Sequence, residues 1–391
     1  MPKGRIITIV LDSVGIGELP DADAYGDAGA HTLGHIAGSV PDFDLPNLRK
    51  LGLANIAPIG DWQPEASPGA YYGKMAEASV GKDTMTGHWE LMGLKIDTPF
   101  RTFPAGFPDA LLSAFEAETG RSVIGNKAAS GTEILDELGE EQMRSGAWIV
   151  YTSADSVFQI AAHEDVIPLE ELYQACRIAR RLTMQEAFSV GRVIARPYVG
   201  NPGAFARTPN RHDYAVKPPQ PTVLNALKRA GSEVVAVGKI NDIFSGEGIT
   251  KAIPTKSNAD GIAATLREME RDFGGLVFTN LVDFDSLYGH RRDPVGYARA
   301  LEEFDRAVPA LLERLRPDDL LIVTADHGND PTHAGTDHTR EYVPLLVAGP
   351  GLRSPGGLGV RGTFADVAAT IAERLEASKP AHGESMLGLL K

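Results

Sequence analysis

The sequence predicts an α/β protein whose core is a doubly wound, mostly parallel sheet with a smaller α/β cap domain inserted into it. Short runs of β-branched and apolar residues alternate with helical patterns on both sides of a central segment. Two proline-rich stretches, after Thr98 and up to Pro221, flank that segment and are typical of linkers. We therefore expect a core built from residues 1–98 and 219–391, with the cap formed by residues 99–218.

The first part of the core begins with a strand and continues with short helices. Arg5–Leu11 (RIITIVL) is a β-branched apolar run, which is typical of a buried strand. Short helices are expected at His31–Ala37 and Pro46–Leu51, with Asp44 as the N-cap of the second. A further helix is expected over Thr86–Leu94, with Thr84 at or just before its amino terminus.

The predicted cap alternates helices and strands. The sequence patterns indicate this order: helix Pro108–Thr119, strand Ser122–Gly125, helix Thr132–Met143, strand Ala147–Thr152, helix Leu169–Arg181, strand Gly191–Ala195.

The second part of the core resumes the alternation and ends with a helix. The elements expected there are, in order: helix Val223–Ala230, strand Glu233–Val237, helix Asp260–Phe273, strand Gly275–Val282, helix Pro294–Leu315, strand Leu320–Val323, strand Tyr342–Ala348, helix Phe364–Leu375.

Composition excludes several classes of function. The 391 residues carry a formal net charge of −14, which argues against nucleic acid as the main partner because phosphate backbones require a basic surface. The single cysteine, Cys176, rules out an internal disulfide and a thiolate metal cluster, and its helical context predicts a packed, inert thiol. Without a signal-peptide pattern or a long apolar run, the chain is expected to be soluble and cytoplasmic, with no membrane partner and no evident obligate protein partner.

The stretch Thr324–His338 (TADHGNDPTHAGTDH) holds the densest group of candidate ligands. It follows the apolar strand Leu320–Val323 and contains Asp326, His327, His333 and His338. The carboxyl edge of a parallel sheet is where α/β proteins bind ligands, and carboxylate with imidazole is a ligand set for Zn²⁺ or Mn²⁺. A polar surface loop would show the same composition. His333 fits either a supporting position or such a loop.

Two other strand ends carry similar residues. Asp12 follows the first strand, where it could equally form a turn or a cap. Asp285 and His290 follow the strand Gly275–Val282. Together with Asp326, His327 and His338 these make six ligands, which is too many for one cation but suits two cations about 4 Å apart.

Thr84 is the candidate nucleophile of such a centre. At a helix amino terminus, unpaired N–H groups and the positive end of the helix dipole favour a phosphate, so a hydroxyl there could be phosphorylated. The alternative is an ordinary capping threonine.

Several basic residues could bind phosphate oxygens. Arg192 lies on an expected strand, Arg207 and Arg211 lie near prolines at the end of the cap, and Lys239 follows the strand Glu233–Val237. The guanidinium group matches the geometry of phosphate. Ion pairs with the many carboxylates of this chain would explain the same arginines.

On these residues the chain resembles the alkaline phosphatase superfamily, and within it the prokaryotic phosphopentomutases, over nearly its whole length. The resemblance implies one cation held by Asp285, His290 and His338 and another held by Asp12, Asp326 and His327. It also implies two Mn²⁺ per chain, with Thr84 between them. The residues implied to bind the pentose phosphate are Ser153, Asp155, Arg192, Arg207 and Lys239.

The reaction implied by the resemblance moves a phosphate between C1 and C5 of ribose or 2-deoxyribose, through phosphorylated Thr84 and a 1,5-bisphosphate. Its partners would be small pentose phosphates, with a bisphosphorylated sugar of the glucose 1,6-bisphosphate type as primer. A cofactor-independent phosphoglycerate mutase or a metal-dependent phosphatase of the same superfamily has similar metal motifs. A protein that binds metal without turnover is the alternative outside enzymes.

Overall fold

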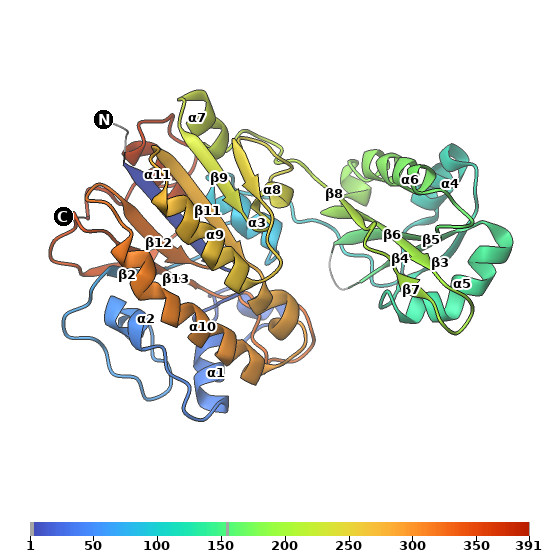
Figure 1. Cartoon of the computed structure of the whole chain (residues 1–391). Coiled ribbons are helices and arrows are strands. Elements are labelled where there is room, and N and C mark those ends of the chain that lie inside the picture. Colours follow the sequence, from blue (N-terminus) through green and yellow to red (C-terminus); the bar gives the residue numbers. More distant parts are fainter. Residues whose placement is uncertain (1–3, 154–155, 391) are drawn as a thin grey trace. The chain divides into compact units, whose positions relative to one another are not determined.

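The computed structural model describes residues 4–153 and 156–390, which form two compact units (Figure 1). Unit 1 comprises Met1–Thr98 and Lys217–Lys391, and unit 2 comprises Pro99–Val216. The sequence analysis had placed the second boundary two residues later, after Pro218. Among the described residues, no helix has the length and apolar character needed to span a bilayer.

Unit 1 is built on one eight-stranded sheet. The strands in spatial order are β10 (Lys251–Ile253), β9 (Glu233–Val237), β11 (Gly275–Leu281), β1 (Arg5–Leu11), β12 (Leu320–Thr324), β13 (Val343–Ala348), β2 (Tyr71–Met75) and β14 (Gly357–Arg361). All neighbouring pairs are parallel except the two that β13 makes, with β12 and with β2. The predicted fold class, an α/β protein with a mostly parallel core sheet, is therefore confirmed.

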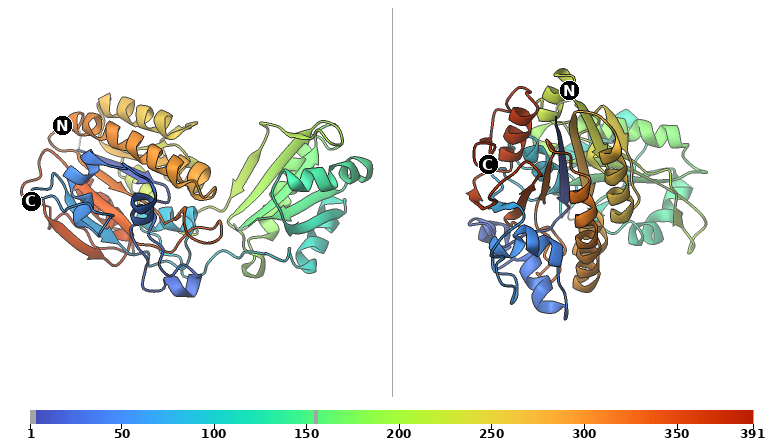
Figure 2. Two further views of the ribbon diagram at one scale, coloured as in Figure 1. Left: turned by 90° about the horizontal axis from the view of Figure 1, so that it is seen from below. Right: turned by 60° about the vertical axis from the view of Figure 1, so that its left-hand side comes forward.

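Helices cover both faces of this sheet. The helices of unit 1 are α1 (Thr32–Ser39), α2 (Pro46–Leu51), α3 (Thr84–Leu91), α7 (Val223–Arg229), α8 (Ile240–Ile243), α9 (Asn258–Glu270), α10 (Pro294–Glu313) and α11 (Ala365–Arg374), with the short turns η1 (Ala22–Tyr25), η2 (Leu53–Asn55) and the π-helix η4 (Phe284–Gly289). Helices α9 and α10 pack on each other, α11 packs on α3 and α7, and α8 packs on α3. The N-cap of α2 is Leu45 and not Asp44, because the helix begins directly at Pro46. In the right-hand view of Figure 2 the sheet lies between α11 and the pair α9 and α10.

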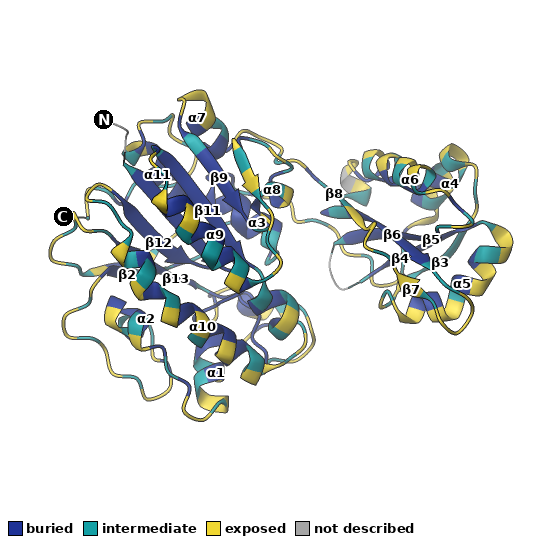
Figure 3. Ribbon diagram, viewed as in Figure 1, coloured by how far each residue is buried: buried dark blue, intermediate teal, exposed yellow. Residues whose placement is uncertain are grey.

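The central strands are the most completely buried elements. Every residue of β1, β11 and β12 is buried, and Figure 3 shows these strands in the dark blue of the core. Such strands have apolar neighbours on both faces, which explains why they were recognisable as continuous apolar runs.

Three strands of unit 1 were missed by the sequence analysis. These are β2, β10 and β14, which have three to five residues and lie at or beside the edges of the sheet. Strand β2 reads YYGKM, with a glycine and a lysine among its five residues. Such segments have weak local preference for the extended conformation, so it is the pairing with a neighbouring strand that makes them strands.

Unit 2 is a six-stranded mixed sheet with three α-helices among its described residues. Its elements are α4 (Asp109–Thr119), β3 (Val123–Ala128), α5 (Glu133–Ser145), β4 (Trp148–Thr152), β5 (Val157–His163), α6 (Leu169–Leu182), η3 (Glu186–Phe188), β6 (Arg192–Val199), β7 (Ala206–Arg207) and β8 (His212–Ala215). The sequence analysis omitted β5, β7 and β8. Strand β5 lies between β4 and β6 and pairs antiparallel with β4.

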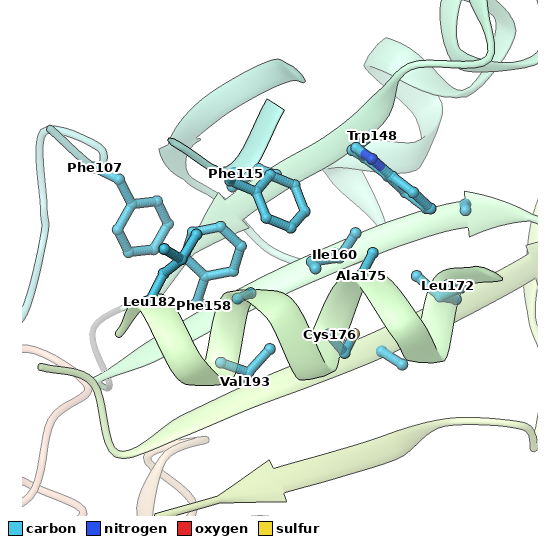
Figure 4. Packing of buried hydrophobic residues seen from close by; sticks show 14 of the residues in the cluster. Phe107, Phe115, Trp148, Phe158, Ile160, Leu172, Ala175, Cys176, Leu182 and Val193 are labelled. Carbon is cyan, nitrogen blue, oxygen red and sulfur yellow. The ribbon is translucent and has the colours of Figure 1, made fainter. Parts of the chain in front are cut away.

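An aromatic cluster forms the core of unit 2. The rings of Phe107 and Phe115 lie 4.5 and 5.6 Å from that of Phe158, and Trp148 packs beside Phe115 (Figure 4). Cys176 is part of the same cluster and has no exposed surface. Burial raises the pKa of its thiol, as expected of an unreactive packed cysteine.

Candidate metal centre and nucleophile

Three adjacent strands deliver the candidate ligands to one edge of the sheet. Strand β1 lies between β11 and β12 and is parallel to both, so the three carboxyl ends coincide. Asp12 follows β1 directly, Asp326 follows β12 by two residues, and Asp285 follows β11 within η4. This is the edge at which α/β sheets bind ligands.

The first ligand group consists of Asp12, Asp326 and His327, whose potential ligand atoms all lie within 4.8 Å of one another. His327 Nε2 lies 3.5 Å from Asp12 Oδ1 and 3.3 Å from Asp326 Oδ2. Its other ring nitrogen, Nδ1, donates to the Gly328 carbonyl at 3.0 Å. That bond leaves the Nε2 lone pair directed at the carboxylates, which is the tautomer a metal ligand requires.

The second ligand group forms around Asp285. Its Oδ1 lies 3.3 Å from His338 Nε2 and its Oδ2 lies 3.2 Å from His290 Nε2. His290 Nδ1 donates to the Thr336 carbonyl at 2.7 Å, and this bond orients the ring so that Nε2 faces Asp285. Asp285 thus lies against both histidines that the resemblance had assigned to this cation, but the three residues whose ligand atoms all lie within 4.8 Å of one another are Asp285, His338 and His327.

His327 joins the two groups. Its side chain also lies within 4.8 Å of the ligand atoms of Asp285 and His338, and its ring centroid is 4.1 Å from that of His338. The six ligands therefore form one continuous cluster, as a centre for two adjacent cations requires.

Three atoms of this cluster test whether a cation fits. Asp12 Oδ1, Asp326 Oδ2 and His338 Nε2 are buried without a hydrogen-bond partner among the described residues. Buried polar atoms without partners are costly, so a group in this position calls for a specific explanation. Carboxylate oxygen and imidazole nitrogen are the donors that Mn²⁺ and Zn²⁺ accept, and a bound cation would satisfy all three atoms.

The charges of the protein alone are unbalanced at this edge. Burial and the neighbouring carboxylates of Asp326 and Asp285 raise the pKa of Asp12 to about 6. Burial alone would lower the pKa of His327, but the carboxylates of Asp326, Asp12 and Asp285 outweigh it and raise that pKa to about 9. The cluster holds an excess of negative charge that divalent cations would neutralise.

Thr84 is the first residue of α3 and lies against the cluster. Its hydroxyl oxygen is 3.1 Å from His327 Nε2. One part of the sequence analysis was wrong: the N–H groups at this helix start are not all free for a phosphate. Asp83 is the N-cap, and its carboxylate accepts from Met85 N and Thr86 N, because a capping carboxylate satisfies these groups within the chain.

The helix reaches the ligands because of a glycine. A Cβ on Gly87 would lie 2.1 Å from the carbonyl oxygen of Asp326, which is backbone and cannot move aside easily. Only a residue without a side chain allows α3 to approach the end of β12 so closely.

Several residues at the site were missed by the sequence analysis. His88 lies one turn after Thr84 and is fully buried, and Asn280 on β11 donates to Asp12 Oδ2 at 2.8 Å. Asn329 donates to Asp285 Oδ1 at 2.7 Å, and Ser13 N donates to Asp326 Oδ1 at 3.1 Å. The spacing of four residues between Thr84 and His88 was the available signal, because it places both on one face of a helix.

Arg292 fixes the loop that carries His338. Its guanidinium group donates to Asn329 Oδ1 at 2.6 Å and to the carbonyl oxygens of Asp330 and Asp337 at 3.0 Å each. His333 lies in the same loop, but its Nε2 donates to the Gly26 carbonyl oxygen at 3.2 Å, and it belongs to neither ligand group.

The residues expected to bind the sugar phosphate belong mostly to unit 2. Ser153 follows β4, Arg192 begins β6, and Arg207 ends β7 with its side chain exposed. Asp155 lies outside the described residues. Lys239 belongs to unit 1, where it is exposed at the start of α8.

Unit 2 also contains an arginine that was not predicted. Burial and the nearby charges of Arg211 and Arg207 lower the pKa of Arg196. Arg211 is paired with Asp213 through two contacts of 2.7 Å, and Arg192 lies 3.8 Å from the same carboxylate. The ion pairing that the sequence analysis gave as the alternative therefore holds for Arg211, whose guanidinium group binds the Asp213 carboxylate through two hydrogen bonds.

Comparison with known proteins identifies the family. The sequence profile of the Metalloenzyme superfamily matches residues 4–379, which is nearly the whole chain. The chain belongs to the Metalloenzyme superfamily. Members of this superfamily are metal-dependent enzymes, in agreement with the two ligand groups.

Solved structures share the fold at low sequence identity. The protein PH0037 from Pyrococcus horikoshii aligns with a TM-score of 0.51 at 14% identity, over 98% of this chain and 100% of that protein. A phosphoglycerate mutase from Leishmania mexicana aligns with a TM-score of 0.46 at 14% identity, over 98% and 97% of the two chains. An alkaline phosphatase superfamily protein from Vibrio parahaemolyticus aligns with a TM-score of 0.43 at 10% identity, over 97% and 68%. The likeness to PH0037 shows that the two chains share a fold.

Proposed function

We propose that this metalloenzyme is a phosphopentomutase, which interconverts ribose 1-phosphate and ribose 5-phosphate and the corresponding 2-deoxyribose pair. The observation that carries phosphoryl transfer is the position of the Thr84 hydroxyl, 3.1 Å from the nitrogen of His327 that faces both ligand groups. The pentose is supported by the resemblance of the whole chain to the prokaryotic phosphopentomutases.

The cations of this proposal are held by Asp12, Asp326 and His327 and by Asp285, His290 and His338. When bound, they neutralise the charge of the transferring phosphoryl group and lower the pKa of the nucleophilic hydroxyl. The chain itself contributes fixed geometry, because His327 and His290 are each held through Nδ1 by a backbone carbonyl.

Transfer proceeds through covalent phosphate on Thr84. A bisphosphorylated sugar first leaves one phosphate on the threonine oxygen. The free hydroxyl of the pentose monophosphate then attacks that phosphorus and gives up its proton, the bond to Thr84 breaks with its electron pair on the threonine oxygen, which takes up a proton, and a 1,5-bisphosphate forms. After the sugar has turned round, Thr84 attacks the other phosphate, and the departing sugar oxygen keeps the electron pair and takes a proton.

The proposal assigns the phosphate that is not being transferred to the basic residues Arg192, Arg207 and Lys239, with Ser153 and Asp155 on the sugar. Binding energy from this remote phosphate would position the reacting one. Arg211 and Arg192 also lie against the carboxylate of Asp213, so a phosphate would compete with that ion pair.

The central test is a mutase assay with ribose 5-phosphate, Mn²⁺ and glucose 1,6-bisphosphate as primer. Ribose 1-phosphate should accumulate, and intact-mass measurement should show one phosphate added to the primed chain. Conversion of phosphoglycerate instead, or release of inorganic phosphate in place of the isomer, would refute the assignment in favour of the related mutase or a phosphatase.

A second assay tests the basic residues. Arg207→Ala should raise the KM for the sugar phosphate by about tenfold and lower kcat, since one lost charge-assisted contact costs roughly 1.5–3 kcal/mol. The matched control is Arg177→Ala, which removes an exposed arginine of the same unit that pairs with Glu170. Equal kinetics in both variants would show that Arg207 does not bind the phosphate.

A further inference from the structure

Both ring nitrogens of the buried His88 are engaged, and their partners define its protonation. Nδ1 lies 2.9 Å from the carbonyl oxygen of Thr84, and Nε2 lies 3.2 Å from Asn280 Nδ2. A carbonyl oxygen only accepts, so Nδ1 carries the hydrogen, and the amide nitrogen only donates, so Nε2 accepts. His88 therefore donates through Nδ1 and accepts through Nε2.

The orientation of Asn280 follows from its second partner. The same Nδ2 lies 2.8 Å from Asp12 Oδ2, which as a carboxylate oxygen accepts. The two hydrogens of the amide thus serve His88 and Asp12, and the assignment does not depend on a free choice between amide nitrogen and oxygen.

These contacts form one chain of hydrogen bonds from the nucleophile to the ligands. It runs from the Thr84 carbonyl through His88 and Asn280 to Asp12 Oδ2, and it leaves Asp12 Oδ1 as the oxygen without a partner. His88 Nδ1 lies 2.9 Å from Asp326 Oδ2 as well, so the hydrogen on Nδ1 faces both the Thr84 carbonyl and this carboxylate. The ring has no exposed surface and packs 5.8 Å from the ring of Phe278.

We propose that His88 is a positioning residue with two separable tasks, an inference that rests on the proposed function of Thr84. Through Nδ1 it fixes the backbone of the nucleophile relative to the ligand cluster. Through Nε2 and Asn280 it selects which oxygen of Asp12 faces the cation. Because neither nitrogen is free, His88 acts as neither a metal ligand nor a proton acceptor in the reaction.

Two substitutions separate these tasks. An asparagine amide occupies nearly the place of Nδ1, and a glutamine amide occupies nearly the place of Nε2. His88→Asn should keep the contact with Thr84 and lose that with Asn280, so Mn²⁺ affinity measured by calorimetry should fall about tenfold while kcat at saturating Mn²⁺ stays within about threefold. His88→Gln should show the reverse, with kcat lowered about 10- to 100-fold at nearly unchanged KM and Mn²⁺ affinity.

His163 provides the matched control. It is also buried and bonded through both nitrogens, to the Gly200 carbonyl and to Asp165 N, but it belongs to unit 2. His163→Asn and His163→Gln should lower Tm without changing Mn²⁺ affinity. If the two His88 variants likewise lose only Tm, or lose kcat and Mn²⁺ affinity in equal proportion, the two-task proposal is wrong.

The protonation state can be tested without substrate or metal. In protein labelled with ¹⁵N-histidine, the signal that disappears in His88→Asn should show a proton on Nδ1 and a bare Nε2 at pH 7. A proton on Nε2, or a doubly protonated ring, would overturn the proposal. This experiment gives its answer even if the chain shows no mutase activity, so the two proposals can fail separately.

Discussion

The two ligand groups differ in how the fold holds them. The side chains of Asp12, Asp326 and His327 are at most 1% exposed, and they follow the buried strands β1 and β12 within three residues. In the second group His290 is 30% exposed, and both histidines lie on loops. The first group is thus anchored by the sheet, whereas the second depends on contacts between loops.

Arg292 is the main contact that holds the second group together. It follows His290 by two residues and binds backbone oxygens on both sides of the loop that ends at His338. Loop segments open at lower free-energy cost than core strands. We therefore expect the second cation to exchange faster than the first.

The largest effect should come from Thr84, which contacts the first group through His327. Thr84→Ala should lower mutase turnover by at least about 10⁴-fold, because the nucleophile itself is lost. Both cations should remain, since the threonine belongs to neither ligand group. Intact mass after priming should show no added phosphate, and turnover near the wild-type rate would exclude Thr84 as the nucleophile.

Single ligand substitutions should remove one cation each. Asp12→Asn and Asp285→Asn should both lower bound metal by about one ion per chain in elemental analysis, because each alters one ligand group. The two ligand groups should also differ in their effect on stability. Asp12→Asn should change the Tm of the metal-free protein, because it removes the repulsion between the buried carboxylates of Asp12 and Asp326. Loss of both ions from either variant would mean that the groups cannot be filled separately.

The pH dependence of the metal-free protein should come from the first group. The folded pKa values of Asp12 and His327 are both raised, to about 6 and about 9, so the folded state binds more protons than the unfolded one. The stability that these groups contribute is present at low pH and is lost as the pH rises through those values. For His327 the free energy of unfolding should fall by on the order of 2 kcal/mol between pH 6.5 and 9.

This dependence can be measured as Tm against pH after chelation. Tm of the metal-free wild type should fall between pH 7 and 9, and His327→Asn should flatten that fall, whereas His338→Asn should leave it in place. With saturating Mn²⁺ the trend should reverse, because the cation displaces the proton from the imidazole. If His327→Asn and His338→Asn changed the fall of Tm with pH equally, the pH dependence would not come from the first ligand group.

The smallest effect should come from the loop contacts. Arg292→Lys should weaken the second cation by about 10- to 100-fold and leave the first unchanged, because lysine cannot reproduce the several directed contacts of the guanidinium group. Metal titration would resolve the two affinities. Arg314→Lys is the control, as that arginine makes an exposed ion pair with Glu270.

The sequence by itself determined the fold class of unit 1 and the composition of the ligand cluster. Buried strands are continuous apolar runs, and the polar residues that follow β1, β11 and β12 must meet at one edge once those strands are parallel neighbours. The start of a helix close to Thr84 was also readable, because capping residues act within a few positions of the helix, although α3 begins two residues before the expected Thr86.

Tertiary structure decided the features that depend on neighbours distant in the chain. Short strands such as β10 and β14 exist through pairing, and β5 was missed although it is buried. Asp83 occupies N–H groups that the local pattern had left for a phosphate. The contact of Asn280 with His88 spans 192 positions. Local periodicity reports which side of an element is buried, but a hydrogen bond between two buried side chains depends on strand order and helix placement, and these arise only when the whole chain packs.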